Sequence, residues 1–158
     1  MCIRDSLMTR PDERIGEPYL RCDPSKVIAV VMTNQPDRNS VYAAPDDTSN
    51  RIAGHIIDFL QHEVKKGRLP KDLLPLQSGV GNIANAVLAG LNNGPFDNLT
   101  AYTEVLQDGM LDMLRSGTLA SASATALSLS PAAMQDFNDR IDYYLSLIHI
   151  SEPTRQAE

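Results

Sequence analysis

The stretch LLPLQSGVGNIANAVLAGLNNGPFDNLTAYTE, residues 73–104, contains the pattern on which the fold depends. A short apolar run over residues 73–77 is followed by a turn with two glycines, and small apolar residues then predict a helix over 82–91. The next apolar run, residues 98–104, has the character of a second strand. A strand, a helix and a strand in this order are typical of an α/β architecture around a largely parallel sheet.

The residues before this stretch predict a further strand and a long helix. KVIAVVMT, residues 26–33, is β-branched and continuously apolar, which favours a central strand covered on both faces. From residue 47 an apolar stripe repeats at helical spacing, and Asp47 or Thr48 is placed to cap the helix. The stripe consists of Ile52, Ile56, Phe59, Leu60 and Val64.

The residues after this stretch continue the alternation. LQDGMLDMLRSG, residues 106–117, predicts a helix that ends at Gly117, and residues 118–129 have room for one or two short strands. Gln107 itself is interpreted as part of the helix start, with support of a pocket as the alternative. Ser130 and Pro131 predict the cap and first residue of a final helix.

The two ends of the chain differ in character from its middle. MCIRDS (residues 1–6) and LSLIHISEPTRQAE (residues 145–158) resemble translated sequencing-adapter DNA rather than evolved protein, so we leave them out of the predicted fold. We therefore expect a sheet truncated at both ends. Because such a sheet exposes edges and core faces, we expect the chain as written to fold poorly and to be inactive.

The composition excludes several classes of function. The formal net charge is −6 and no basic cluster is present, which argues against nucleic acid as the main partner. With Cys2 in the first end segment, Cys22 has no second thiol, so we expect a reducing, cytoplasmic setting and no metal site. His55 and His62 are expected on a helix surface, because a metalloprotease helix needs histidines four apart. The longest apolar run, residues 27–32, is too short for a membrane span.

The glycine turn has three interpretations that spacing alone leaves open. Gly79, Gly81 and Ala84 fit the dinucleotide pattern G-x-G-x-x-A, with Glu104 in the role that binds a ribose. The turn could equally be structural. In the third interpretation its backbone N–H groups stabilise an oxyanion while a facing carboxylate attacks an acyl carbonyl.

Several long blocks show a resemblance that bears on this choice. LPLQSGVGNIANAVLAGL, FDNLTAYTEVLQDGMLDMLRSG and ASATALSLSP, with DDTSNRIAGHIIDFLQHEVKKGRLP upstream, resemble the acetyl-CoA hydrolase/transferase family, particularly its acetate and succinate CoA-transferases. The likeness covers nearly all of residues 7–144. It implies an α/β, CoA-transferase-like open sheet, largely parallel and flanked by helices. Residues 7–72 would end the first CoA-transferase domain, and residues 73–144 would begin the second, which carries the catalytic glutamate.

The resemblance also implies an activity and a set of site residues. Members move coenzyme A between a short-chain acyl-CoA, such as acetyl-CoA or succinyl-CoA, and a carboxylic acid such as acetate or succinate. Glu104 matches the family's nucleophile, which forms a glutamyl-CoA thioester, and the backbone N–H of Val80 matches an oxyanion donor. The residues expected along bound CoA are Gly79, Val80, Gly81, Asn82 and Ile83.

Further expectations follow from the same resemblance. Coenzyme A is a substrate, so no cofactor or metal is expected, and the complete protein is expected to be a cytoplasmic homodimer. The alternative within the family is an acetyl-CoA hydrolase, in which water resolves the intermediate.

Overall fold

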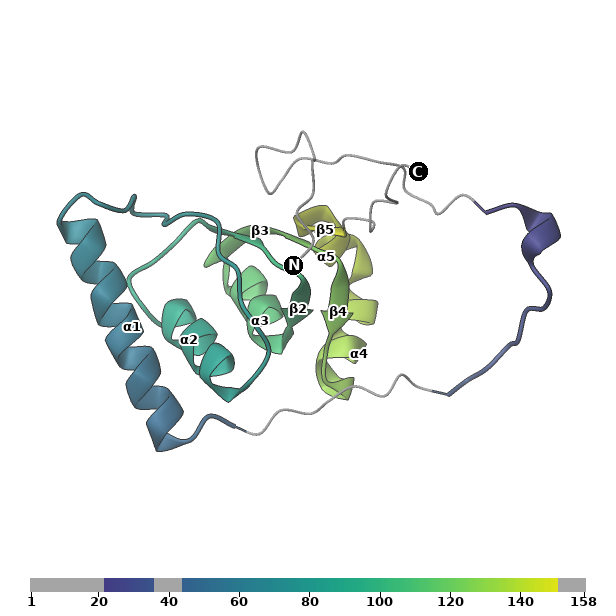
Figure 1. The fold of residues 1–158 in the computed structure, drawn as a ribbon, viewed down its shortest axis with the longest axis horizontal. Coiled ribbons are helices and arrows are strands. Elements are labelled where there is room, and N and C mark those ends of the chain that lie inside the picture. Colours follow the sequence, from purple (N-terminus) through teal and green to yellow (C-terminus); the bar gives the residue numbers. More distant parts are fainter. Residues whose placement is uncertain (1–21, 36–43, 151–158) are drawn as a thin grey trace.

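The computed structural model describes residues 22–35 and 44–150 of the chain (Figure 1). Helices and strands alternate along most of the described sequence. Its elements are the 3-10 helix η1 (Pro24–Lys26), α1 (Asp47–Lys65), α2 (Asn82–Asn92), β1 (Leu99–Tyr102), β2 (Val105–Gln107), α3 (Asp108–Ser116), β3 (Leu119–Ala124), β4 (Ala126–Ser128), α4 (Pro131–Asp139), α5 (Ile141–Leu147) and β5 (Ile148–Ile150).

The strands form two small parallel sheets. The order in the first is β1-β3-β5, and the second consists of β2 and β4. A single parallel bridge between Leu76 and Ala101 places residue 76 beside β1. Parallel neighbours need a crossover: α3 lies in the connection from β1 to β3 and in that from β2 to β4, and α4 with α5 lies in the connection from β3 to β5. The predicted α/β class with parallel strands is confirmed.

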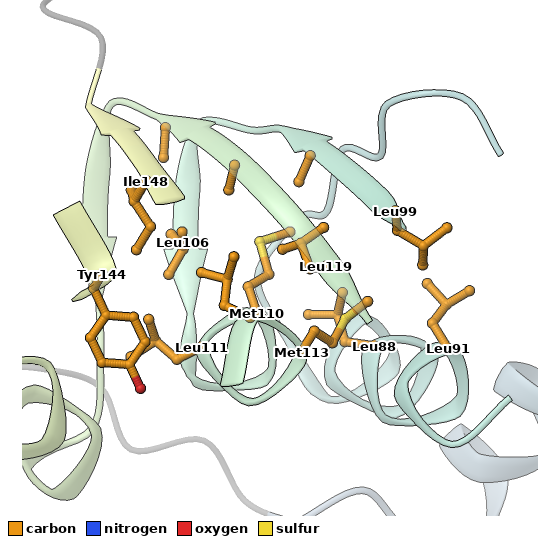
Figure 2. Close-up of a cluster of buried hydrophobic side chains, with 14 of the residues drawn as sticks. Leu88, Leu91, Leu99, Leu106, Met110, Leu111, Met113, Leu119, Tyr144 and Ile148 are labelled. Atoms are coloured by element: carbon orange, nitrogen blue, oxygen red, sulfur yellow. The ribbon is translucent and has the colours of Figure 1, made fainter. Parts of the chain in front are cut away.

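The hydrophobic core lies between the three-stranded sheet and the helices α2 and α3 (Figure 2). Four side chains from α3 are at most 2% exposed: Met110, Leu111, Met113 and Leu114. Figure 2 shows Met110 below the sheet and Leu111 beside Tyr144. Helix α2 adds Leu88 and Leu91 beside them. A Cβ atom on Gly109 would lie 3.2 Å from the Cβ atom of Leu88, so a glycine allows α2 and α3 to pack this closely.

The N-cap of α1 lies one residue before the predicted capping positions, Asp47 and Thr48. Asp46 is the N-cap, and its carboxylate accepts a hydrogen bond from the Ser49 N–H at 2.7 Å. This bond lowers the pKa of Asp46 from its ordinary value, because it stabilises the ionised carboxylate.

The buried face of α1 agrees with the predicted stripe in part, since Leu60 and Val64 pack against the core, but it is shifted at the other positions. Ala53 and Ile57 are buried, whereas Ile52 is 36% exposed and Phe59 is 60% exposed. Gly90 of α2 explains the shift, because a Cβ atom there would lie 3.1 Å from Cγ1 of Ile57. Because α1 and α2 approach closely at this point, the face of α1 that carries Ala53 and Ile57 is the one that is buried.

Local signals correctly predicted the later helix ends. Gly117 ends α3 in the left-handed conformation, with φ of 84°. The Ser130 side chain accepts a hydrogen bond from the Ala133 N–H, and Pro131 is the first residue of α4. The two strands expected within residues 118–129 are β3 and β4.

Two predicted strands are wrong in whole or in part. Residues 27–35 form no strand, and Ile28 is 100% exposed. A strand needs a hydrogen-bonded neighbour, and no strand of the described residues pairs with this segment. The strand expected over 73–77 is reduced to the bridge at Leu76, because Leu73 has a φ of 56°, which extended backbone does not adopt.

Part of the second end segment enters the fold, contrary to our exclusion of it. Helix α5 continues to Leu147, and β5 pairs in parallel with β3. Ile148 is 1% exposed. Strand pairing uses backbone groups, so an apolar segment that reaches the free edge of β3 can join the sheet whatever its origin. Residues 1–6 and 151–158 lie outside the described part of the chain.

Candidate active site

Glu104 lies at an interruption between two pairs of parallel strands. β1 pairs with β3 and β2 pairs with β4, and Glu104 stands in the gap between β1 and β2. Its carbonyl oxygen accepts hydrogen bonds from the N–H groups of Thr125 at 3.0 Å and Ala126 at 3.1 Å, and from the Thr125 hydroxyl at 2.7 Å. The residue itself is exposed. These three hydrogen bonds fix the backbone at Glu104.

The glycine turn is exposed and leads directly into α2. Gly81 is the N-cap with a φ of 134°, and no side chain caps the helix. Val80 is 57% exposed and Ile83 is 47% exposed. Gly79 and Asn82 are also exposed. Uncapped N–H groups at a helix N-terminus favour an anionic ligand group.

The structure brings the turn and the Glu104 segment together. The Thr103 hydroxyl donates to the carbonyl oxygen of Ser78 at 3.0 Å, and Nε2 of Gln107 donates to the carbonyl oxygen of Gly79 at 2.8 Å. Thr103 is 6% exposed and Gln107 is 1% exposed. The segment that carries Glu104 is therefore hydrogen-bonded to the glycine turn through two buried polar side chains.

Sequence reasoning missed the roles of Thr103 and Thr125, and saw Gln107 mainly as a helix start. Gln107 is the N-cap residue of α3, yet its side chain makes no capping bond and reaches back to Gly79. Polar residues within the apolar run around Glu104 were the available signal. Their partners lie about twenty or more residues away, so spacing could not identify them.

The dinucleotide interpretation lacks part of its structural context. It requires a strand that leads into the glycine turn, and only the bridge at Leu76 is present there. Ala84 lies in the first turn of α2, as that pattern requires.

Within the described part of the chain, the histidines of α1 do not form a metal site. His55 and His62 lie exposed on α1, as predicted. No group of three or more His, Cys, Asp or Glu side chains within residues 22–35 and 44–150 could hold a metal ion. In the same ranges, no helix has the length and apolar character to cross a membrane.

A hollow between α3 and α4 is lined by charged residues that are already paired. Arg115 contacts Asp112 and Asp136. The Tyr144 hydroxyl also donates to Asp136, and burial together with this bond raises the pKa of Tyr144 to about 12. Neither Glu104 nor the glycine turn lines this hollow.

Comparison with known proteins gives one consistent set of relatives. No family model matches the chain. It is 48% identical over 137 residues to an acetyl-CoA hydrolase of Schizosaccharomyces pombe, a match that covers 87% of this chain and 26% of the relative. It is 44% identical over 131 residues to a succinyl-CoA:acetate CoA-transferase of Clostridium kluyveri, covering 83% of this chain and 24% of the relative.

A solved structure is also similar. The 4-hydroxybutyrate CoA-transferase of Porphyromonas gingivalis matches with a TM-score of 0.48 and 19% identity, over 71% of this chain and 27% of that one.

The curated relatives confirm the resemblance found in the sequence. The chain belongs to the acetyl-CoA hydrolase/transferase family. It spans about a quarter of the length of the curated relatives that it matches.

Proposed function

We propose that the complete protein containing this segment transfers coenzyme A between a short-chain acyl-CoA and a carboxylic acid, with Glu104 as the nucleophile. The observation that supports this most directly is the pair of hydrogen bonds from Thr103 and Gln107 to the glycine turn. They join the exposed glycine turn to the short segment that carries the exposed Glu104. The relatives named acetyl-CoA hydrolase and succinyl-CoA:acetate CoA-transferase supply the class of substrate.

The proposed reaction passes through two covalent intermediates. A carboxylate oxygen of Glu104 attacks the acyl carbonyl carbon, and the CoA thiolate leaves to give a mixed anhydride. The thiolate then attacks the glutamyl carbonyl and releases the first carboxylic acid, which gives a glutamyl-CoA thioester. An incoming carboxylate reverses the two steps and leaves as the new acyl-CoA.

The glycine turn would act at the carbonyl oxygen. Negative charge develops on the oxygen of the carbonyl under attack, first the acyl and then the glutamyl carbonyl, and the N–H of Val80 would donate to that oxygen. Loss of one preorganised donor of this kind costs about 10²–10³-fold in kcat in other acyl-transfer enzymes. Gly79, Gly81, Asn82 and Ile83 would lie along the CoA moiety, whose binding energy can be used at the reacting carbonyl.

A hydrolase is the second candidate, because several of the similar proteins are named acetyl-CoA hydrolases. Water would then replace the acceptor carboxylate in resolving the thioester. Both reactions use Glu104 and the glycine turn in the same roles, so the acceptor alone distinguishes them. In either case we propose a cytoplasmic homodimer that acts on acyl-CoA and small carboxylates without a resident cofactor or metal.

The test uses the complete protein and its Glu104→Gln variant. With acetyl-CoA and succinate, the transferase predicts formation of succinyl-CoA, whereas the hydrolase predicts free CoA at a rate that succinate does not change. Glu104→Gln keeps the shape of the side chain and removes the nucleophile, so we expect kcat to fall by at least about 10³-fold. Full activity in Glu104→Gln, or binding of NAD without binding of CoA, would contradict the proposed function.

A further inference from the structure

We infer that Thr103 and Gln107 are positioning residues that turn two successive peptide N–H groups of the glycine turn, those of Gly79 and Val80, toward the reacting carbonyl. This inference rests on the proposed function and assigns side chains that control the oxyanion donor.

The first of these peptide units joins Ser78 to Gly79. Its carbonyl oxygen accepts the hydroxyl hydrogen of Thr103 at 3.0 Å. In a planar trans peptide the C=O and the following N–H point in opposite directions. The bond from buried Thr103 therefore directs the Gly79 N–H away from the core.

The second peptide unit joins Gly79 to Val80. Its carbonyl oxygen accepts a hydrogen bond from Nε2 of Gln107 at 2.8 Å. Because the C=O and the N–H of a peptide point in opposite directions, the Val80 N–H points away from Gln107. Gln107 is 1% exposed, so it holds this carbonyl from inside the protein. No described residue accepts a hydrogen bond from the N–H of Gly79 or Val80, and both residues are exposed. The two N–H groups are thus free to bind a ligand oxygen.

A turn of this composition needs such restraint. A Cβ atom at Gly79 would meet nothing within 4 Å, and Gly81 has a φ of 134° that favours glycine. Glycine permits a peptide unit to rotate at little cost, so the backbone alone does not fix which way the N–H points. Donors that are already oriented need no reorganisation during the reaction, and this is the source of their effect on rate.

The hydrogen bonding of the Gln107 side-chain amide indicates a functional constraint. Its Oε1 atom is buried and has no hydrogen-bond partner among the described residues. A buried acceptor without a partner opposes folding, and a residue selected for stability alone would avoid it. Among the described residues, only the Nε2 atom of the amide forms a hydrogen bond, and its partner is the carbonyl oxygen of Gly79 in the turn.

Thr103 and Gln107 also link the donors to the nucleophile. One directly precedes Glu104 and the other follows it by three positions. The same short segment therefore carries the attacking carboxylate and fixes the peptides that stabilise the product of its attack. A shift of this segment moves both groups together.

The test compares substitutions of similar shape in the complete protein. Thr103→Val and Gln107→Met remove the donors with little change in volume, and Thr103→Ser keeps the hydroxyl. Thr118→Val, at the start of β3 and away from the turn, is the matched control. We expect Thr103→Val and Gln107→Met each to lower kcat by about 10–100-fold while KM for the acyl-CoA changes less than about threefold. Thr103→Ser and Thr118→Val should stay within about threefold of the unsubstituted protein.

Two readouts keep a positioning role separate from loss of folding. The rate of glutamyl-CoA thioester formation in a single turnover should fall with kcat, whereas the thermal transition of Thr103→Val should match that of Thr103→Ser. If Thr103→Val and Gln107→Met keep kcat, or raise KM alone, while Glu104→Gln is inactive, this inference is overturned and the proposed function stands. Full activity in Glu104→Gln would instead contradict the proposed function itself.

Discussion

Thr125 donates both its backbone N–H and its hydroxyl hydrogen to the carbonyl oxygen of Glu104, at 3.0 and 2.7 Å. Thr125 stands between β3 and β4, opposite the gap in which Glu104 lies. The proposed nucleophile is therefore anchored through its backbone, and the residue itself is exposed. Precise placement of a reacting group contributes strongly to the rate, so this anchor should matter for kcat more than for substrate binding.

Substitution of Thr125 by valine tests this anchor. The variant removes the hydroxyl and keeps the N–H bonds from Thr125 and Ala126, so the loss should be partial. We expect kcat of the complete protein to fall by about 3–10-fold with an unchanged KM, since one of several restraints is lost. Steady-state kinetics with acetyl-CoA measures this, with Thr125→Ser as the control that keeps the hydroxyl. An unchanged kcat in Thr125→Val would show that the two N–H bonds suffice.

Packing on the two sides of α2 should affect function differently. In Gly109→Ala the new Cβ atom would lie 3.2 Å from Cβ of Leu88, and a Cβ atom cannot rotate away, so α2 and its glycine turn must shift. In Gly90→Ala the contact is 3.1 Å to Cγ1 of Ile57, which can change rotamer. Overpacking of this kind costs about 1–3 kcal/mol. We expect both variants to lower stability and Gly109→Ala alone to lower kcat.

Thermal unfolding and kcat of the complete protein, measured together, check this pair. Equal losses of kcat in Gly90→Ala and Gly109→Ala would mean that movement of the glycine turn does not cause the loss of kcat in Gly109→Ala.

The cap of α1 should make its stability depend on acid pH. The Ser49 N–H lowers the pKa of Asp46 below its ordinary value of 3.8. Because the folded pKa is lower than the unfolded one, the contribution is fully present above about pH 4 and is lost as the pH falls through the folded value. Amide hydrogen exchange along α1 should therefore accelerate below about pH 4, beyond the intrinsic change in exchange chemistry.

Asp46→Asn is the matched control for this prediction. Asparagine keeps an oxygen that accepts the Ser49 N–H but does not titrate, so the acid dependence of α1 should flatten. The same acid dependence in Asp46→Asn would assign it to another carboxylate, such as Glu63, whose pKa is lowered by its bond with Arg68.

The sequence was most informative where structure depends on local chemistry. Gly117 and Ser130–Pro131 marked helix ends correctly, because caps involve residues only a few positions apart. The strand predicted over residues 26–33 failed for the opposite reason: an apolar run forms a strand only beside a neighbour, which the described residues do not supply. The face of α1 was predicted only in part: Leu60 and Val64 pack against the core, whereas the close approach of Gly90 on α2 favours Ile57 over the predicted Ile52 and Phe59.

The same limit applies to the candidate site. Glu104 and the glycine turn were found from the resemblance to a family, whereas spacing left three interpretations open. Thr103 bonds to a residue 25 positions earlier and Gln107 to one 28 positions earlier, and such contacts become visible when the chain is folded. The one signal that the sequence offered was the presence of these polar residues within an apolar run.

The central claim is that Glu104 forms a covalent thioester with coenzyme A. The most direct test incubates the complete protein with acetyl-CoA, treats it with borohydride and determines the mass of the peptide that carries Glu104. The account predicts a mass change at Glu104 that corresponds to reduction of a glutamyl thioester to the alcohol, and no such change without acetyl-CoA. An unmodified Glu104 in protein that is fully active would contradict the account.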